Sequence, residues 1–247
     1  TYQATHDALT GLPNRTQLLE RLGKAIAVAR GNPQACFAVL FLDLDRFKLV
    51  NDSAGHAVGD ELLIEAARRI VGSVRTGDVV SRLGGDEFAI LAESLDGPDM
   101  AAELGRRVLA ALGAPVWLAG RELFPTASIG IALSHARYES GEDMLRDADA
   151  AMYRAKGDGR DRSVMFDEHM RDEATRILDM ESDLRRAINA EAFEPFYQPI
   201  VQLVSGERVG HEALLRWRHE QRGLLTPGDF LDVGEDSGLI EQVDWLM

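Results

Sequence analysis

The stretch that decides the fold is "RLGGDEFAIL", Arg82–Leu91, in which two glycines and two acidic residues separate runs of strand-forming residues. Glycines between two such runs favour a tight β-hairpin, because they accept backbone angles that other residues avoid. The stretch therefore predicts two antiparallel strands joined around Gly84 and Gly85. It also places Asp86 and Glu87 at the hairpin tip, where like charges repel each other.

A second acidic stretch, "CFAVLFLDLDRF" at 36–47, ends a nearly unbroken apolar run. Such a run predicts a strand covered on both faces. Asp43 and Asp45 lie two residues apart, so their side chains share a face unless the strand has already ended. If this strand lies beside the hairpin, Mg²⁺ between the two sets of carboxylates would remove the repulsion. The alternative is an ordinary solvated turn, since acidic residues are common at hairpin tips.

Helical and strand patterns alternate through the first two thirds of the chain. Apolar residues at helical spacing predict helices within 15–30, 59–75, 99–112 and 143–156, and a further strand lies within 123–133. One strand pair is a tight hairpin, whereas helices separate the other strands. The predicted fold class is therefore α/β, with a mixed central sheet flanked by helices.

The pattern changes after residue 166. Residues 167–190 predict one long, charge-rich helix, which is either a linker between domains or an additional packed helix. Residues 191–247 predict two strands joined by the turn "SGER", followed by short helices. We therefore expect a first domain over 1–166, a helical linker over 167–190, and the start of a larger domain over 191–247.

Charge and composition restrict the partners. The net charge of −14 argues against a grip on long nucleic acid, which depends on Lys and Arg neutralising phosphates. A small phosphorylated ligand remains compatible if divalent cations lie between it and the carboxylates. The single cysteine, Cys36, favours a reducing compartment and a small buried side chain. We expect a cytoplasmic location, although a preceding region could anchor the full-length protein to a membrane.

The hairpin motif and four other stretches, in order and at similar spacing, resemble the GGDEF family of diguanylate cyclases. The four are "DALTGLPNR" (7–15), "FLDLDRFKLVND" (41–52), "GHAVGDELL" (55–63) and "DADAAMYRAKGDGRD" (147–161). The resemblance implies a fold similar to adenylate cyclase and polymerase palm domains. It also implies condensation of two GTP to cyclic di-GMP and two pyrophosphates by a homodimer, with one GTP per subunit. An upstream sensory domain would provide the signal.

The resemblance implies two Mg²⁺ or Mn²⁺ ions per active site. Asp43, Asp86 and the carbonyl of Leu44 match the family's metal ligands. Glu87 would bind metal or activate the 3′-hydroxyl. Two other readings stay open: a regulatory module that senses GTP or cyclic di-GMP and controls a C-terminal phosphodiesterase, and an interaction scaffold without nucleotide chemistry.

The substrate positions of the family also map onto this sequence. Asn51 and Asp60 match the residues that recognise the guanine edge. The other positions would contact phosphates or admit them closely: Lys48, Lys156, Arg160, the backbone at Phe47, Gly84 and Gly85. Simpler explanations exist for several of them. Asp60 would favour the dipole of a helix first turn, Lys156 and Arg160 would cap a helix C-terminus, and the glycines would serve an ordinary turn.

The stretch "RTGD", Arg75 to Asp78, begins nine residues before Gly84. This spacing resembles the family's inhibitory site, to which cyclic di-GMP binds back as a feedback inhibitor. Arg106 lies where a second arginine from a neighbouring helix would join that site. The alternative is a surface Arg–Asp ion pair, which contributes less than about 1 kcal/mol.

The stretch "FYQPIVQLVSGERVGHEALLRW" at 196–217 resembles the opening of an EAL domain, the (β/α) barrel of cyclic di-GMP phosphodiesterases. Gln198 and Arg216 match substrate-contact positions, and Glu212 matches a metal-ligand position. The later metal-ligand positions of that family would fall after Met247. We therefore expect no phosphodiesterase activity from residues 1–247 themselves.

Overall fold

The computed structural model describes residues 4–32, 35–135 and 137–244. The chain divides into two compact units, Thr1–Arg171 and Asp172–Met247. No helix in these described ranges is long and apolar enough to cross a membrane.

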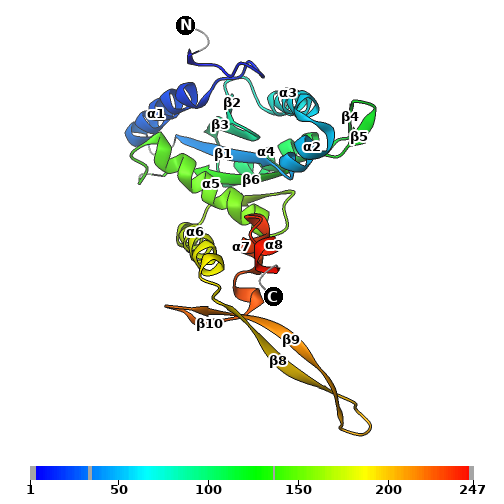
Figure 1. The fold of residues 1–247 in the computed structure, drawn as a ribbon. Coiled ribbons are helices and arrows are strands. Elements are labelled where there is room, and N and C mark those ends of the chain that lie inside the picture. The colour runs from blue at the N-terminus through cyan, green and yellow to red at the C-terminus, as the bar shows by residue number, and fades with distance from the viewer. Residues whose placement is uncertain (1–3, 33–34, 136, 245–247) are drawn as a thin grey trace. The chain divides into compact units, whose positions relative to one another are not determined.

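The first unit is built on one five-stranded sheet (Figure 1). Its strand order is β2-β3-β1-β6-β7, and every neighbouring pair is antiparallel except β6 and β7, which are parallel. The sheet is therefore mixed, as predicted. The strands are β1 Cys36–Leu44, β2 Val79–Gly84, β3 Glu87–Leu95, β6 Ala127–Leu133 and β7 Arg162–Met165.

The central strand β1 explains the position of the acidic residues. Residues 37–42 are all buried, because β1 has a neighbouring strand on each side and helices over both faces. Its register pairs Asp43 with Glu87 of β3 and with Ser128 of β6. The acidic end of β1 thus lies beside the hairpin tip, which is the condition under which the sequence predicted a shared cation. The strand ends at Leu44, so Asp45 lies outside the alternation of the strand.

Helices cover the two faces of the sheet. Side chains of a strand alternate between faces, so Phe41 packs with α1 and α5, whereas Leu42 packs with α3 and α4. Apolar spacing predicted these four helices, with ends that differ by a few residues. They are α1 Arg15–Gly31, α3 His56–Ser73, α4 Pro98–Leu112 and α5 Gly141–Gly157.

Helix α5 packs very closely on strand β6. A Cβ atom on Gly130 would lie 1.8 Å from the carbonyl oxygen of Ala148 and 2.2 Å from the amide nitrogen of Met152. Only glycine permits this approach of helix backbone to strand backbone. The approach fixes how deeply α5 sits, and α5 carries Asp149 and Lys156.

Three short features were not predicted. Helix α2, Phe47–Ala54, directly follows the acidic end of β1, and β4 Val116–Leu118 pairs with β5 Arg121–Leu123 in a separate hairpin. Strand β7 extends the sheet at its parallel edge. Cys36 is a free thiol as expected, but it is only half-buried, because it begins β1 at the rim of the core.

The second unit contains a three-stranded antiparallel sheet of β8 Phe193–Val201, β9 Arg208–His219 and β10 Gly223–Leu225. The sheet is open, and the described residues form no closed barrel. The long predicted helix is α6, Glu168–Asn189, and its Leu184 packs in one apolar cluster with Trp217 and Phe230. That part of α6 is a packed element, which was the alternative to a linker. The short C-terminal elements are η2 Pro227–Asp229, α7 Leu231–Asp236 and α8 Ile240–Asp244.

Candidate active site

The acidic residues of β1 and of the β2–β3 hairpin meet at one end of the sheet. Asp43 and Glu87 are direct cross-strand partners, and the backbone N–H of Leu44 donates to the carbonyl oxygen of Asp86 over 3.3 Å. The side chain of Asp43 is only 14% exposed. The structure therefore gathers the three predicted catalytic residues, Asp43, Asp86 and Glu87.

A cation from α5 reaches the same place. The Nζ atom of Lys156 lies 2.9 Å from Oδ1 of Asp43, and its side chain is 24% exposed. Although Lys156 lies in the last turn of α5, its ammonium group binds a carboxylate of the sheet, so helix capping does not account for it. Arg160 lies beyond the helix in a left-handed backbone conformation, with φ of 62°.

Burial dominates the electrostatics of Asp43. The pKa of this carboxyl is raised from 3.8 to about 6, mainly by desolvation and also by the nearby charges of Asp86 and Glu87, against the opposing effect of Lys156. A buried carboxylate that lies beside other carboxylates favours protonation or a bound cation. Perturbation of this kind is typical of functional sites.

The sequence prediction missed two residues of this cluster, Arg15 and Asp149. Desolvation, Asp149 and Asp86 together raise the pKa of Glu87, whereas Lys156 and Arg15 lower it. Asp149 is exposed at the surface. Partial desolvation of its carboxyl nevertheless raises its pKa, against the opposing effect of Lys156 and Arg15. Both residues belong to quoted motifs, "DALTGLPNR" and "DADAAMYRAK", but spacing alone gave neither of them a role.

The donors at this end of the sheet fit a hard divalent cation. In the part of the chain that the structure describes, no three His, Cys, Asp or Glu residues gather closely enough to hold a metal by themselves. Mg²⁺ does not require such a cage, because it keeps waters and binds substrate phosphates alongside one or two carboxylates. The carboxylates of Asp43 and Asp86 and the carbonyl of Leu44 supply only oxygen donors, which suits Mg²⁺ or Mn²⁺ rather than zinc.

The hairpin tip is held by an arginine clamp. The guanidinium of Arg82 donates to the carbonyl oxygen of Gly85 from Nη2 over 2.6 Å and from Nε over 3.1 Å. Its Nη1 donates to both carboxylate oxygens of Asp7, at 2.9 and 3.0 Å. Burial pushes the pKa of Asp7 upward, but hydrogen bonds from Thr10 and Arg82 outweigh it and hold that pKa below the usual value. The clamp therefore fastens the turn to the loop ahead of α1.

The two glycines of the turn serve the backbone and leave space. Gly84 and Gly85 have φ of 150° and 49°, and a Cβ atom on either would meet nothing within 4 Å. Asp86, the second loop residue, does not share the positive φ, which excludes a type I′ turn. The open space in front of the glycines is compatible with close approach of a ligand.

The predicted guanine-contact residues lie where α2 meets α3. Oδ1 of Asn51 would be 2.0 Å from a Cβ on Gly59, so the amide packs directly against the residue before Asp60. Asp60 is exposed and follows the first turn of α3, which begins at His56, so the dipole explanation for Asp60 is not supported. The phosphate candidates on α2 are Phe47, which begins the helix and is half-buried, and Lys48, which is exposed.

The "RTGD" residues line a pocket of about 450 Å³ at the end of α3. The carboxylate of Asp78 accepts from the backbone N–H of Arg75 at 2.9 Å and of Glu93 at 3.2 Å. Asp78 thus shapes the turn through backbone contacts, which differs from the surface ion pair considered as the alternative. Arg21 of α1 also lines this pocket, a contribution that the sequence prediction missed.

Arg106, the second arginine expected to join this site, lies on α4. Arg106 pairs with Glu103 on its own helix and does not line the pocket. Its neighbour Arg107 instead donates from Nε to the carbonyl oxygen of Ser73, at the C-terminal end of α3, over 2.7 Å. The role of Arg106 in an inhibitory site therefore stays a prediction.

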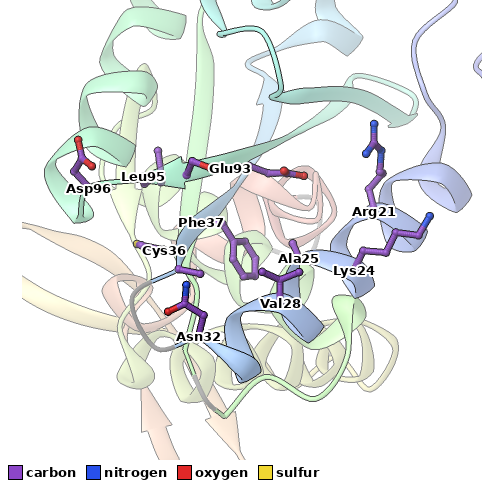
Figure 2. Close-up of a pocket in the computed structure, with 12 residues that line it drawn as sticks. Arg21, Lys24, Ala25, Val28, Asn32, Cys36, Phe37, Glu93, Leu95 and Asp96 are labelled. Atoms are coloured by element: carbon purple, nitrogen blue, oxygen red, sulfur yellow. The ribbon is translucent and has the colours of Figure 1, made fainter.

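Another pocket, of about 490 Å³, lies between α1, the start of β1 and the end of β3 (Figure 2). Phe37 and Val28 form an apolar part of its lining, and Lys24, Arg21 and Asp96 are charged groups around it. None of the site residues implied by the family resemblance lines this pocket, and it shares Arg21 with the pocket of the "RTGD" residues.

The predicted residues of the second unit lie on one face of the β8–β9 hairpin. Gln198 and Glu212 are direct cross-strand partners, and Arg216 lies two pairs further along the same face, opposite Glu194. Gln198 and Glu212 are exposed. The guanidinium of Arg216 lies 5.9 Å from the ring centre of Phe196.

Comparison with known proteins agrees with this geometry. The family model described as "Diguanylate cyclase, GGDEF domain" matches residues 4–162, and the model of the EAL domain matches residues 181–247. The chain therefore belongs to the GGDEF family of diguanylate cyclases, and part of an EAL domain follows in the same chain.

Individual relatives extend over both regions or over the first alone. The chain is 44% identical over 245 residues to the bifunctional diguanylate cyclase/cyclic di-GMP phosphodiesterase MucR of Pseudomonas aeruginosa, covering 99% of this chain and 36% of MucR. The chain thus spans about a third of that relative. The GGDEF domain of TpbB (or YfiN) from P. aeruginosa is 40% identical, with a TM-score of 0.65, and the match covers 70% of this chain and 99% of that one. The coiled coil and GGDEF domain of DgcB from Caulobacter crescentus, in complex with c-di-GMP, is 28% identical, with a TM-score of 0.62 over 66% of this chain and 86% of that one.

Proposed function

We propose that the first unit is an active diguanylate cyclase that condenses two GTP into cyclic di-GMP and two pyrophosphates. The observation that carries this proposal is the convergence of Asp43, Asp86 and Glu87 at one end of the sheet, with Lys156 2.9 Å from Asp43. The acidic signature is complete, whereas a purely regulatory module has no need of it. Cyclase activity is thus the function that the site supports best.

The reaction divides into recognition, activation and charge neutralisation. Two subunits face each other, each with one GTP, and the 3′-hydroxyl of each nucleotide attacks the α-phosphorus of the other. Two phosphodiester bonds form, the bonds to two pyrophosphates break, and each hydroxyl gives up its proton. Positioning and charge neutralisation provide most of the rate in such transfers.

The residues of the chain have distinct tasks in this scheme. Asn51 and Asp60, at the α2–α3 corner, read the guanine edge through amide and carboxylate groups. Lys156 and Arg160 supply positive charge to the phosphates. Glu87 lies beside Asp43, where partial burial and neighbouring acids raise its pKa, which favours a role as proton acceptor for the 3′-hydroxyl.

Asp43, Asp86 and the carbonyl of Leu44 would hold the divalent cations. When bound, Mg²⁺ or Mn²⁺ lowers the pKa of a coordinated hydroxyl and neutralises phosphate charge. Such binding also replaces the proton or the lysine ammonium as the counter-charge for the buried carboxylate of Asp43.

The test is GTP turnover with Mg²⁺ at several protein concentrations, with pyrophosphate and dinucleotide followed together. We expect cyclic di-GMP to increase more steeply than linearly with protein concentration, because two subunits complete the reaction. The Asp86→Asn variant should lose at least about 10³-fold of the rate, since charge stabilisation is commonly the largest catalytic contribution. A matched control is Glu207→Gln in the exposed turn of the β8–β9 hairpin, which should retain full activity.

Product inhibition forms part of the proposal. The pocket with Arg75, Asp78 and Arg21 offers two guanidinium groups for phosphate or guanine edges. Added cyclic di-GMP should slow the wild-type protein and have little effect on Arg75→Ala. Equal inhibition of both proteins would remove the pocket from this role.

A regulatory role is the second candidate, favoured by the EAL segment that follows in the same chain. GTP binding without dinucleotide at any protein concentration would replace the cyclase proposal with this one. Binding of neither GTP nor cyclic di-GMP would leave only a scaffold.

A further inference from the structure

A second aspartate, Asp45, lies just beyond the end of β1 and has no part in the site described so far. Its carboxylate accepts three hydrogen bonds: Oδ1 from the hydroxyl of Ser128 at 2.7 Å, and Oδ2 from the hydroxyl of Thr126 at 2.8 Å and from the backbone N–H of Asp161 at 3.2 Å. Its own N–H donates to the carbonyl oxygen of Thr126 at 2.9 Å. Asp45 therefore joins the start of β6 to the loop after α5.

The loop that Asp45 holds has an unfavourable backbone conformation. Arg160 and Asp161 are consecutive non-glycine residues with φ of 62° and 47°. Residues in left-handed conformations cost of order 1–3 kcal/mol each and persist only where surrounding contacts fix them. Contacts that fix this loop include the hydrogen bond from the N–H of Arg160 to the carbonyl of Ala155 at 3.0 Å, that from Nε of Arg162 to the carbonyl of Arg160 at 3.1 Å, and that from the N–H of Asp161 to Asp45.

Asp45 also borders the turn that leads into α2. The next residue, Arg46, is in a left-handed conformation with φ of 57°, and α2 begins immediately after it. The helix carries Lys48 and Asn51, which are candidates for phosphate and guanine contacts. One carboxylate thus lies between two segments that present substrate contacts, α2 and the Arg160 loop.

We propose that Asp45 is a positioning residue for GTP, whose carboxylate fixes the Arg160 loop in the conformation that binds phosphate. This inference rests on the proposed function, in which Arg160 contacts the nucleotide. Asp45 itself touches neither nucleotide nor metal in this proposal. Its bond from the N–H of Asp161 holds the left-handed pair, and its bonds from Thr126 and Ser128 fix the carboxylate that accepts it.

The chemistry of the three donors distinguishes two substitutions. In Asp45→Asn, the amide oxygen can still accept from Thr126 and Asp161, and the amide NH₂ can donate to the hydroxyl oxygen of Ser128, because a hydroxyl both donates and accepts. In Asp45→Ala, the backbone N–H of Asp161 loses its acceptor. The asparagine variant should therefore behave as the conservative replacement.

The experiment uses the full chain and compares Asp45→Ala, Asp45→Asn and a control, Asp96→Ala, at an exposed aspartate between β3 and α4. The first readout is amide hydrogen exchange of residues 157–162. The second is the affinity for 3′-deoxy-GTP with Mg²⁺, a probe that lacks the attacking hydroxyl. The third is the KM for GTP and the kcat of dinucleotide formation.

We expect Asp45→Ala to accelerate exchange at Asp161 and to weaken 3′-deoxy-GTP binding by about 10- to 100-fold, with a corresponding rise in KM, because misplaced binding groups have effects of this size. Asp45→Asn should stay within about threefold of wild type, since most hydrogen bonds survive. The control should change neither exchange nor binding.

Several outcomes would overturn the role of Asp45: unchanged exchange at Asp161 in Asp45→Ala, faster exchange without weaker binding, or an equal loss in the alanine and asparagine variants. If Asp45→Ala fails to fold, the pair Thr126→Val and Ser128→Ala removes two donors and keeps the carboxylate, and unchanged exchange and binding there would overturn it as well.

A wild-type protein that binds 3′-deoxy-GTP but forms no dinucleotide contradicts the cyclase proposal, while exchange and binding still decide the role of Asp45. A wild-type protein that does not bind the probe overturns both.

Discussion

The candidate residues of the two units lie in opposite surroundings. In the first unit, Asp43 ends a central strand, helices cover both faces of the sheet, and its side chain is 14% exposed. In the second unit, Gln198 and Glu212 face each other on a hairpin whose adjacent Tyr197 is 65% exposed. Burial raises the pKa of Asp43 to about 6. The comparison shows that a motif determines which residues are neighbours, whereas burial by the surrounding domain shifts the pKa of their side chains.

Among the variants that test this comparison, the largest effect should come from removing the ammonium group of Lys156 beside Asp43. In Lys156→Met, the dinucleotide rate should fall by about 100-fold or more, because a desolvated charge contact to phosphate is lost. The pKa of Asp43 should move further above about 6, since burial and the neighbouring acids remain while the opposing charge is gone. Carboxyl NMR titration and the pH–rate profile measure both changes.

The control for this variant is Lys24→Met on the exposed side of α1, where the lysine pairs with Glu20 in solvent. It should retain wild-type activity, since exposed ion pairs contribute about 0–1 kcal/mol. An Asp43 titration that is the same in Lys156→Met and wild type would contradict the described contact.

A matched pair of glycine substitutions compares how tightly the two units are packed. Gly130→Ala would place a methyl group 1.8 Å from the carbonyl oxygen of Ala148, whereas Gly210→Ala would place one 3.9 Å from Cδ1 of Ile200, an ordinary contact. We expect Gly130→Ala to destabilise the first unit by about 2–4 kcal/mol through overpacking, and Gly210→Ala to change stability by less than about 0.5 kcal/mol.

Hydrogen exchange under native conditions, read separately for β6 and β9, measures each unit by itself. Similar losses in both strands would contradict the difference in packing. A stable Gly130→Ala protein with normal exchange in β6 would require that α5 can shift away from the sheet.

The smallest expected effect is the dependence of the free energy of unfolding on pH, which should have opposite sign in the two units. Without divalent cations, folded Asp43 keeps its proton up to pH about 6, whereas the unfolded chain releases it near 3.8. The folded state binds more protons in this window, so the free energy of unfolding should fall, on the order of 2 kcal/mol, as pH rises from about 4 to about 6. Asp86→Asn should reduce this fall, because it removes a charge that raises the pKa of Asp43.

The second unit should respond in the other direction. Burial pushes the pKa of Asp183 upward, but hydrogen bonds from His219 and Arg186 outweigh it and lower that pKa below 3.8. This contribution to stability is complete above pH 3.8 and disappears as the pH falls through the lowered value. Urea unfolding at a series of pH values, followed by segment-resolved exchange, checks both signs. Parallel pH profiles would contradict the comparison.

The elements that sequence predicted correctly carry a strong local signal. The apolar run before Asp43 identified a strand buried on both faces, and the paired glycines identified the hairpin at residues 84–87. These patterns predicted that Asp43 and Glu87 meet only if the strand lies beside the hairpin, and the structure supplies that neighbourhood. The mixed sheet and the family membership followed from these features and from the order of the motifs.

The features that sequence did not predict depend on contacts between distant residues or on short elements. Arg82 and Asp7 are 75 positions apart, and neither lies in a periodic pattern that reveals the other. The contact of Arg107 with the carbonyl of Ser73 depends on how α4 packs beside α3, which helical periodicity does not reveal. Helix α2 and the β4–β5 hairpin are too short for helical or strand periodicity to identify them.

The clamp at Arg82 determines where a minimal catalytic fragment can begin. The loop that contains Asp7 precedes the first helix, so a boundary drawn from secondary structure alone would start at Asn14, the cap of α1. A shortened protein of that kind would retain its sheet and helices but lose the carboxylate that anchors Arg82. Its hairpin turn would then keep the Arg82–Gly85 bonds and the bond from Leu44 to Asp86, but lose its attachment to the loop ahead of α1. Fragments meant to report cyclase activity therefore need to start ahead of Asp7, and a silent fragment that starts later says nothing about the intact domain.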